Sequence, residues 1–210
     1  MKAVIVSGGQ PLSASRARVI LSGIDYVVCA DKGAKYAADY GIIPDLVVGD
    51  MDSVDEVSLS GIDKSKILVS PKEKDYTDTH LAVVKALEKG ADQIIIICAT
   101  GLRSDHTIAN IRLLLFIESK GAVGKIIDDE NIISLCTGKL EFDNKVGTTV
   151  SLIALSDKVK GITLSGFKYP LNNCNADLGW TTGISNEIIA EKAIITVTSG
   201  NLLIFEIHNN

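Results

Sequence analysis

The sequence feature that most restricts the possible folds of this chain is a run of four consecutive isoleucines, Ile94 to Ile97. An apolar run without polar alternation is typical of a strand buried on both faces, as in a parallel sheet covered by helices. Similar short runs alternate with stretches that carry apolar residues at helical spacing. The predicted strands are Ala3–Val6, Tyr26–Ala30, Leu46–Val48, Ile67–Val69, Ile94–Cys98 and Lys125–Ile127, and the predicted helices are Lys32–Tyr40, Thr77–Lys89 and Thr107–Ser119. This alternation predicts an α/β domain over residues 1–129 with a doubly wound, mostly parallel sheet.

The second part of the chain has a different pattern. Long helical patterns end after Asn131, and short runs rich in Thr, Val, Ile and Gly follow, separated by turn signals such as Ser199-Gly200-Asn201. The predicted strands are Ile132–Cys136, Leu140–Phe142, Thr148–Leu155, Ile162–Leu164, Ile194–Thr198 and Leu202–Ile207. Short strands at this spacing indicate a small all-β sandwich or barrel over residues 130–210.

Composition and charge exclude several classes of protein. The 210 residues are 46% hydrophobic and 22% charged, which is an ordinary globular balance. A net charge of −5 argues against nucleic acid or an anionic membrane as the main partner. No apolar run approaches the ~20 residues of a membrane span. The four cysteines have no Cys-x-x-Cys spacing, so we expect a cytoplasmic protein without a disulfide framework or zinc site.

Two aspartates one residue apart directly follow the predicted strand Leu46–Val48. Residues i and i+2 of an extended chain point the same way, so Asp50 and Asp52 can face one spot. Adjacent carboxylates repel one another unless a cation lies between them. Mg²⁺, which takes oxygen ligands and often shares them with substrate phosphates, is the expected occupant. For a single Asp-x-Asp, the simpler alternative is a solvated acidic turn.

Acidic residues follow three other predicted strands of the first domain. The carboxyl ends of parallel strands share one edge of the sheet, where ligands bind. We therefore expect four acidic loops on one rim. These loops carry Asp31; Asp50 and Asp52; Lys72, Lys74, Asp75 and Asp78; and Arg103, Asp105 and His106. Acids that hold a metal, beside bases that hold phosphate oxygens, are what a phosphoryl-transfer site requires.

Helix capping is the competing interpretation of these acids. Asp31 and Asp105 each precede a predicted helix, and Asp75 with Asp78 three residues later resembles a capping box. Capping does not explain why Asp50 and Asp52 stand one residue apart after Leu46–Val48. It also does not explain the lysines and the arginine that accompany the acids.

Standard nucleotide motifs are absent from the sequence, and no nucleophile stands out. There is no P-loop and no Gly-x-Gly-x-x-Gly, and Ser7-Gly8-Gly9-Gln10 is as consistent with a turn as with a ligand-binding loop. His80 falls within a predicted helix and His208 at the tail. His106 is thus the histidine expected on the rim, where a supporting role is at least as consistent as catalysis.

The motifs together resemble one enzyme family. They are Asp31-Lys32-Gly33-Ala34, Pro44 through Ser53, Lys74-Asp75-Tyr76-Thr77-Asp78, Gly101 through Asn110, Gly166 through Leu171, Gly183 through Glu187 and Ser199 through Ile204. In order and spacing, this set is similar to the motifs of bacterial thiamine pyrophosphokinases. The resemblance spans nearly the whole chain.

The resemblance implies transfer of the pyrophosphoryl group of ATP to the hydroxyl of thiamine, giving thiamine diphosphate and AMP. It implies an ATP- and Mg²⁺-binding catalytic domain over 1–129, a thiamine-binding β-sandwich over 130–210, and a homodimer with its active site at the subunit interface. The implied site residues are, for catalysis, Asp50, Asp52, Asp75 and Asp78, the first three as metal ligands; for the nucleotide, Asp31, Lys74, Arg103, Asp105 and His106; and for thiamine, Ser185 and Asn186.

Trp180 is added to the thiamine residues on physical grounds, because an aromatic face suits the thiazolium charge. Packing in or at the rim of the sandwich core is an equally consistent role for it.

Two other functions stay open. A pyrophosphokinase acting on a pterin-type alcohol would keep the chemistry and change the acceptor. A nucleotide- or thiamine-sensing module would bind without catalysis.

Overall fold

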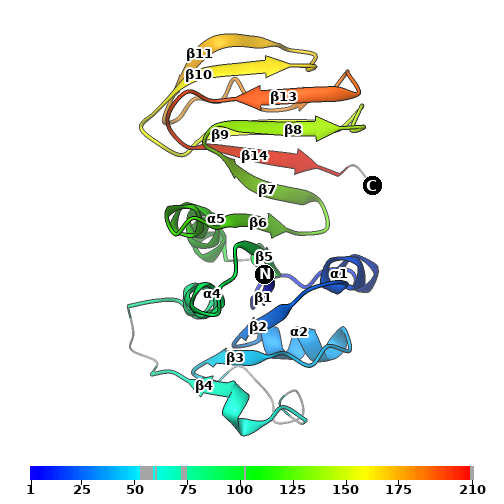
Figure 1. The fold of residues 1–210 in the computed structure, drawn as a ribbon, viewed down its shortest axis with the longest axis vertical. Helices are drawn as coiled ribbons and strands as arrows, with labels where there is room; N and C mark the ends of the chain where they lie inside the picture. The colour runs from blue at the N-terminus through cyan, green and yellow to red at the C-terminus, as the bar shows by residue number, and fades with distance from the viewer. Residues whose placement is uncertain (53–58, 60, 72–74, 102, 209–210) are drawn as a thin grey trace. The chain divides into compact units, whose positions relative to one another are not determined.

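The computed structural model describes residues 1–52, 59, 61–71, 75–101 and 103–208. The chain divides into two compact units, Met1–Asp129 and Glu130–Asn210. In the first unit the strands lie in the order β6-β5-β1-β2-β3-β4, and all neighbours pair in parallel (Figure 1). Their bounds are β1 Lys2–Val6, β2 Tyr26–Ala30, β3 Leu46–Gly49, β4 Ile67–Val69, β5 Gln93–Ile97 and β6 Val123–Ile127.

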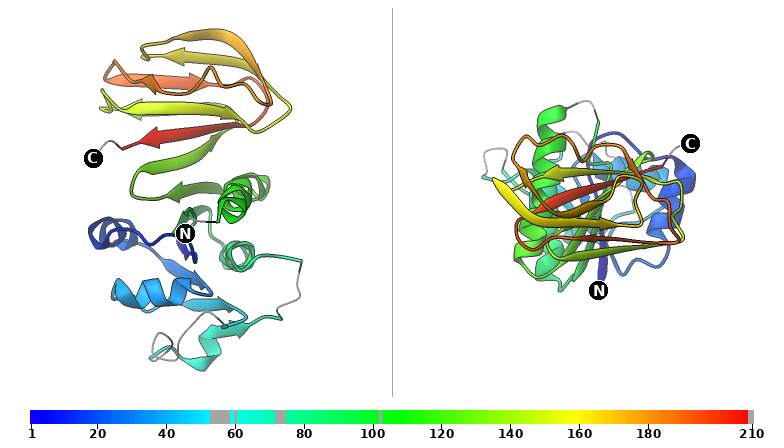
Figure 2. Two further views of the ribbon diagram at one scale, coloured as in Figure 1. Left: turned by 180° about the vertical axis from the view of Figure 1, so that it is seen from behind. Right: turned by 90° about the horizontal axis from the view of Figure 1, so that it is seen from above.

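Helices cover both faces of this parallel sheet. They are α1 Ala14–Leu21, α2 Gly33–Asp39, α4 Asp78–Glu88 and α5 Ser104–Ser119, with a short 3-10 turn η1 at Lys64–Lys66. Figures 1 and 2 show α1 and α2 on one side of the strands and α4 and α5 on the other. The predicted doubly wound α/β class is therefore confirmed for this unit.

The isoleucine run forms the centre of the first unit. Ile94, Ile96 and Ile97 are almost fully buried in β5, which lies between β1 and β6. Leu114 and Ile117 of α5 are buried as well, and they approach β6 at Gly124, where an added Cβ would lie 2.9–3.0 Å from their side chains. Burial of large aliphatic side chains is the main stabilising contribution to such a core.

The second unit consists of two antiparallel layers. The strands β12-β9-β14-β7 form one layer and β11-β10-β13-β8 form the other. Their bounds are β7 Asn131–Cys136, β8 Lys139–Asp143, β9 Thr149–Ala154, β10 Lys158–Ser165, β11 Leu171–Asp177, β12 Asn186–Glu187, β13 Lys192–Thr196 and β14 Leu202–Ile207. Side chains of both layers share one apolar core, including Leu152 and Ile204 from one layer and Ile162 and Ile195 from the other. The predicted all-β unit is confirmed.

Some of the described elements differ from the sequence-based expectation. Helix α1, the 3-10 turn η1 and strands β11 and β12 lie where no helix or strand is predicted. Within the described residues, none of the helices has the length and apolar character needed to cross a membrane.

Candidate functional site

The strand order of the first unit reverses between β1 and β5. From β1 the chain winds outward through β2, β3 and β4, then continues on the other side of β1 through β5 and β6. Open α/β sheets bind ligands at such a reversal, beyond the carboxyl ends of the strands. A cleft of about 850 Å³ lies at this place, lined by the segments that follow β1, β2 and β5 and by the starts of α4 and α5.

The loop after β1 lies directly against the loop after β5. The amide of Ser7 donates to the carbonyl of Ile97 (2.9 Å), and the amide of Gly9 donates to the carbonyl of Cys98 (2.7 Å). A Cβ on Gly9 would lie 2.3 Å from the carbonyl oxygen of Thr100, so only glycine fits there. Ser7-Gly8-Gly9-Gln10, an ambiguous signal in the sequence, therefore forms one wall of the cleft.

Three aspartates from neighbouring strands converge at the sheet edge. Asp31 directly follows β2, and Asp50 and Asp52 follow β3. One carboxylate oxygen from each lies within 4.8 Å of the others. The amide of Asp52 also donates to Oδ1 of Asp50 (3.1 Å), which holds this turn together. Hard oxygen ligands in such a group suit a divalent cation such as Mg²⁺.

The backbone is unusual where these acids stand. Asp31 has φ 47° and Met51 has φ 63°, in the left-handed region that costs about 1–2 kcal/mol per residue for an L side chain. The amide of Asp31 donates to the carbonyl of Val48 (2.8 Å), which ties the two loops together. Strained residues of this kind cluster at functional sites, where the surrounding structure fixes them.

The two acids that follow β4, Asp75 and Asp78, do not lie in the same place. Asp78 lines the cleft from the first turn of α4. Asp75 is exposed, and among the described side chains it is not part of the three-aspartate group. Thr77 caps α4 by accepting from the amide of His80 (3.2 Å), so Asp75 is not the capping residue. Lys74, predicted to contact the nucleotide, lies outside the described residues.

Arg103 and His106 both line the cleft, but Arg103 already holds a carboxylate. Its Nε and Nη2 donate to the two oxygens of Asp105, at 2.9 and 2.7 Å. This two-pronged contact keeps the pKa of Asp105 well below its usual range. Asp105 stands in the first turn of α5, which begins at Ser104 with Arg103 at the N-cap position. The guanidinium has further N–H groups that remain for a phosphate.

Several lining residues were not singled out from the sequence. Lys32 and Tyr36 line the cleft beside Asp31, and Lys32 occupies the N-cap position of α2, which excludes Asp31 from that position. Asn110 is buried and donates to the carbonyl of Ala99 (2.8 Å). Strand–loop–helix spacing indicates the acidic loops. Lys32 and Asn110 belong to motifs named in the sequence but have no role assigned there, and Tyr36, inside α2, belongs to none of those motifs.

The predicted thiamine residues lie in the second unit. Asn186 is buried: its side-chain oxygen accepts from the amides of Tyr169 and Glu187, and its nitrogen donates to the carbonyl of Tyr169 (2.8 Å). Ser185 has φ 58°, and its amide donates to the hydroxyl of Ser151 (2.9 Å). Trp180 is half-buried and packs against the core. Asn186 thus shapes the backbone around Tyr169.

Comparison with known families identifies both units. The family described as "Thiamin pyrophosphokinase, catalytic domain" matches residues 17–123. The family described as "Thiamin pyrophosphokinase, vitamin B1 binding domain" matches residues 138–204.

Individual relatives agree with these matches. Thiamine pyrophosphokinase of Bacillus subtilis (strain 168) is 38% identical over 177 residues, which cover 82% of this chain and 83% of the relative. The crystal structure of the Bacillus subtilis enzyme superposes with a TM-score of 0.88 at 32% identity over 100% of both chains. That of thiamin pyrophosphokinase from Geobacillus thermodenitrificans superposes with a TM-score of 0.84 at 32% identity over 100% of this chain and 99% of the other. The chain belongs to the thiamine pyrophosphokinase family.

Proposed function

We propose that the protein transfers the pyrophosphoryl group of ATP to the hydroxyl of thiamine, giving thiamine diphosphate and AMP. One observation supports this most strongly: a cleft at the reversal of the strand order has a three-aspartate group beside it and basic side chains in its walls. Phosphoryl transfer depends on positioning and charge neutralisation more than on a reactive side chain. The relatives named above, all thiamine pyrophosphokinases, support the same reaction.

We propose that Asp31, Asp50 and Asp52 hold Mg²⁺. Oxygens on opposite sides of an octahedral Mg²⁺ are about 4.2 Å apart, because each lies about 2.1 Å from the ion. The carboxylate oxygens of the group already lie within 4.8 Å of one another, so small side-chain rotations suffice. A bound Mg²⁺ would neutralise charge on the phosphate oxygens. Asp75 stays a predicted ligand from the sequence, and it is separate from this group.

The chain's own cations would fix the nucleotide. Arg103 is oriented by Asp105, and a planar guanidinium binds phosphate through two parallel N–H groups. Lys32 supplies a point charge from the N-cap position of α2, where it also lines the cleft. His106 lines the same cleft and can donate a hydrogen bond to the nucleotide. In the reaction the thiamine oxygen bonds to the β-phosphorus, the bond from that phosphorus to the α–β bridging oxygen breaks, and AMP leaves.

We propose that the second unit binds thiamine near Ser185. The match of residues 138–204 to the vitamin B1 binding domain supports this assignment. Because the Asn186 amide is engaged with backbone groups, its expected contribution is to shape the Tyr169 segment, with Ser185 and Trp180 nearer to the ligand.

We also propose a homodimer with the active site at the subunit interface, in which the acidic rim of one subunit faces the thiamine site of the other. Exposed apolar side chains flank the predicted thiamine residues: Tyr169 is 62% exposed and Ile184 is 46% exposed. Exposed apolar residues beside a binding site are typical of surfaces that a partner covers.

The cysteine spacing supports the cytoplasm as the working compartment.

A coupled assay for AMP release tests the proposed reaction. With ATP and Mg²⁺, thiamine should give AMP and thiamine diphosphate in equal amounts, whereas hydroxymethylpterin should give neither. AMP formation with the pterin alone would establish the alternative acceptor. Binding of both ligands without AMP formation would establish a sensing module.

A further inference from the structure

We propose that Tyr36 is a positioning residue for the nucleotide. From helix α2 it fixes both the glycine loop that forms one wall of the cleft and the ammonium group of Lys32. This inference rests on the proposed binding of ATP in the cleft. It adds Tyr36 as a residue that contributes to nucleotide binding indirectly, through the glycine loop and Lys32.

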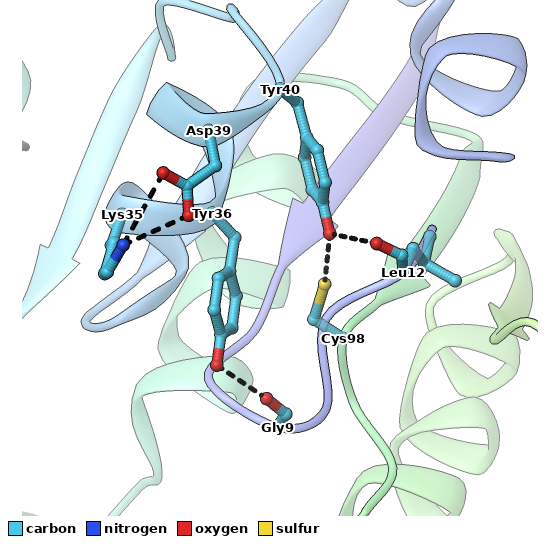
Figure 3. A network of polar contacts seen from close by, with 7 residues as sticks. All are labelled: Gly9, Leu12, Lys35, Tyr36, Asp39, Tyr40 and Cys98. Atoms are coloured by element: carbon cyan, nitrogen blue, oxygen red, sulfur yellow. Dashed lines mark hydrogen bonds and ion pairs between the residues drawn. The ribbon is translucent and has the colours of Figure 1, made fainter. Parts of the chain in front are cut away.

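The first contact fixes the glycine loop. The Tyr36 hydroxyl donates to the carbonyl of Gly9 at 2.9 Å (Figure 3). The Gly9 amide donates to Cys98 and the next amide, that of Gln10, donates to the carbonyl of Thr100 at 2.8 Å. Gly9 and the peptide that follows it are therefore held from α2 and from the loop after β5 at once.

The second contact holds a cation. The Nζ atom of Lys32 lies over the ring of Tyr36, 5.4 Å from its centroid. An ammonium group over an aromatic face is attracted by the ring quadrupole. Lys32 is an exposed residue that lines the cleft, and an exposed lysine has many rotamers to lose on binding phosphate. The ring thus pre-orders a charge that would otherwise be mobile.

Tyr40 supports the same loop one helical turn later. Its hydroxyl donates to the carbonyl of Leu12 at 3.1 Å and lies 3.7 Å from Sγ of Cys98 (Figure 3). Burial raises the pKa of Tyr40, so the hydroxyl keeps the proton it donates. Tyr36 within α2 and Tyr40 at its C-cap therefore hold the two ends of the segment from Gly9 to Leu12 by hydrogen bonds.

The glycine content of the loop explains why these hydrogen bonds matter for ligand binding. Glycine loses more conformational freedom on ordering than any other residue, and Gly8 and Gly9 are consecutive. A loop that is ordered before the ligand arrives avoids that cost at binding. Loss of the brace should therefore weaken ATP binding and leave thiamine binding unchanged, which a general loss of folding would not do.

The decisive variant is Tyr36→Phe, which removes the hydroxyl and keeps the ring. We expect the KM for ATP to rise about fivefold, the equivalent of one hydrogen bond of about 1 kcal/mol. The KM for thiamine and the kcat at saturating ATP should stay within twofold. Titration with a fluorescent ATP analogue should show the same fivefold loss of affinity. The matched control is Tyr26→Phe, because Tyr26 lies at the amino end of β2, away from the cleft.

Lys32→Met and Tyr36→Leu test the second contact. Each should raise the KM for ATP, and the double variant should be less impaired than the product of the two effects, because removal of the ring already releases the lysine. Independent effects that simply multiply would overturn the claim that the ring positions Lys32. A normal KM for ATP in folded Tyr36→Phe would overturn the claim for the loop.

The same assays separate this inference from the proposed function. If the unmodified protein forms no AMP from ATP and thiamine, the function is wrong and Tyr36 is not tested by turnover. The fluorescent ATP titration then still decides, because unchanged binding in Tyr36→Phe contradicts the positioning role. Thermal unfolding of each variant excludes loss of fold as the cause of a raised KM.

Discussion

Gly49 and Asp31 lie so close together that a Cβ on Gly49 would be 3.0 Å from the Cβ of Asp31 and 3.1 Å from its Cα. Gly49 has φ 154°, a conformation that L side chains rarely adopt. It is the last residue of β3, directly before Asp50. The absence of a side chain at this position therefore allows the loops after β2 and β3 to approach and their carboxylates to form one group.

Gly49→Ala tests the importance of this approach. We expect the free energy of unfolding to fall by about 3 kcal/mol, from backbone strain plus overpacking. Urea unfolding gives this value, and a Mg²⁺ titration in the presence of ATP should show weaker metal binding. The control is Gly41→Ala: Gly41 also has positive φ but no atom within 4 Å of an added Cβ, so it should lose only about 1–2 kcal/mol. Equal effects of the two substitutions would contradict the close-contact explanation.

Asp50→Asn and Asp52→Asn test the metal assignment. Each removes one charge from the three-aspartate group, and we expect kcat to fall by about 100-fold or more. Thermal unfolding should stay near that of the unmodified protein, because neither carboxylate is in the core. Asp39→Asn is the control, since Asp39 pairs with Lys35 on the outer face of α2 (Figure 3). Near-normal rates in both site variants would refute the assignment.

The acidic group was only partly predictable from the sequence. Strand–loop spacing places Asp50 and Asp52 together, but which other loop joins them depends on strand order. Because β2 pairs with β3, Asp31 stands beside them. Asp75 follows β4, which is also a neighbour of β3, yet it does not join the group. Pairing order alone therefore does not decide which aspartates belong to the group.

Missed elements of the fold have physical causes. Helix α1 is eight residues long and buries only Ala17 and Leu21, so its apolar periodicity is weak. Strand β11 has the sequence LNNCNAD, which contains three asparagines, and asparagine is depleted in strands. It forms because β10 supplies its hydrogen-bonding partner and only Ala176 needs to be buried. Tertiary pairing thus overrides a poor local propensity.

His80 should make stability depend on pH. Its ring lies edge-on between Tyr76 and Phe116, with centroids 4.4 and 4.6 Å away, and burial lowers its pKa. The unfolded state, with an ordinary pKa of about 6.5, therefore takes up the proton first as pH falls. Stability from His80 is complete above pH 6.5 and is lost as pH falls from there through the lower folded-state pKa.

The substitution His80→Phe keeps the aromatic contacts and removes the titration. Urea unfolding midpoints measured at pH 7.5 and 5.5 should differ less in His80→Phe than in the unmodified protein. The same difference in both proteins would show that His80 does not contribute to the pH dependence.

Ile184→Glu tests the proposed dimer. Ile184 is exposed in the second unit beside Ser185, and a charge there should disfavour burial against a partner subunit. Sedimentation velocity should show a dimer for the unmodified protein and a shift to monomer for the variant, with turnover reduced in parallel. Val19→Glu, an equally drastic change at an exposed residue of α1, should stay dimeric. A monomeric, fully active unmodified protein would contradict the interface.

A crystal structure with Mg²⁺, thiamine and a non-hydrolysable ATP analogue tests the central claim most directly. We predict an ion about 2.1 Å from oxygens of Asp31, Asp50 and Asp52. We also predict that the phosphates lie in the cleft between the Gly8-Gly9 loop and Arg103. A nucleotide bound elsewhere, or an ion that none of these three carboxylates contacts, would contradict the proposed site.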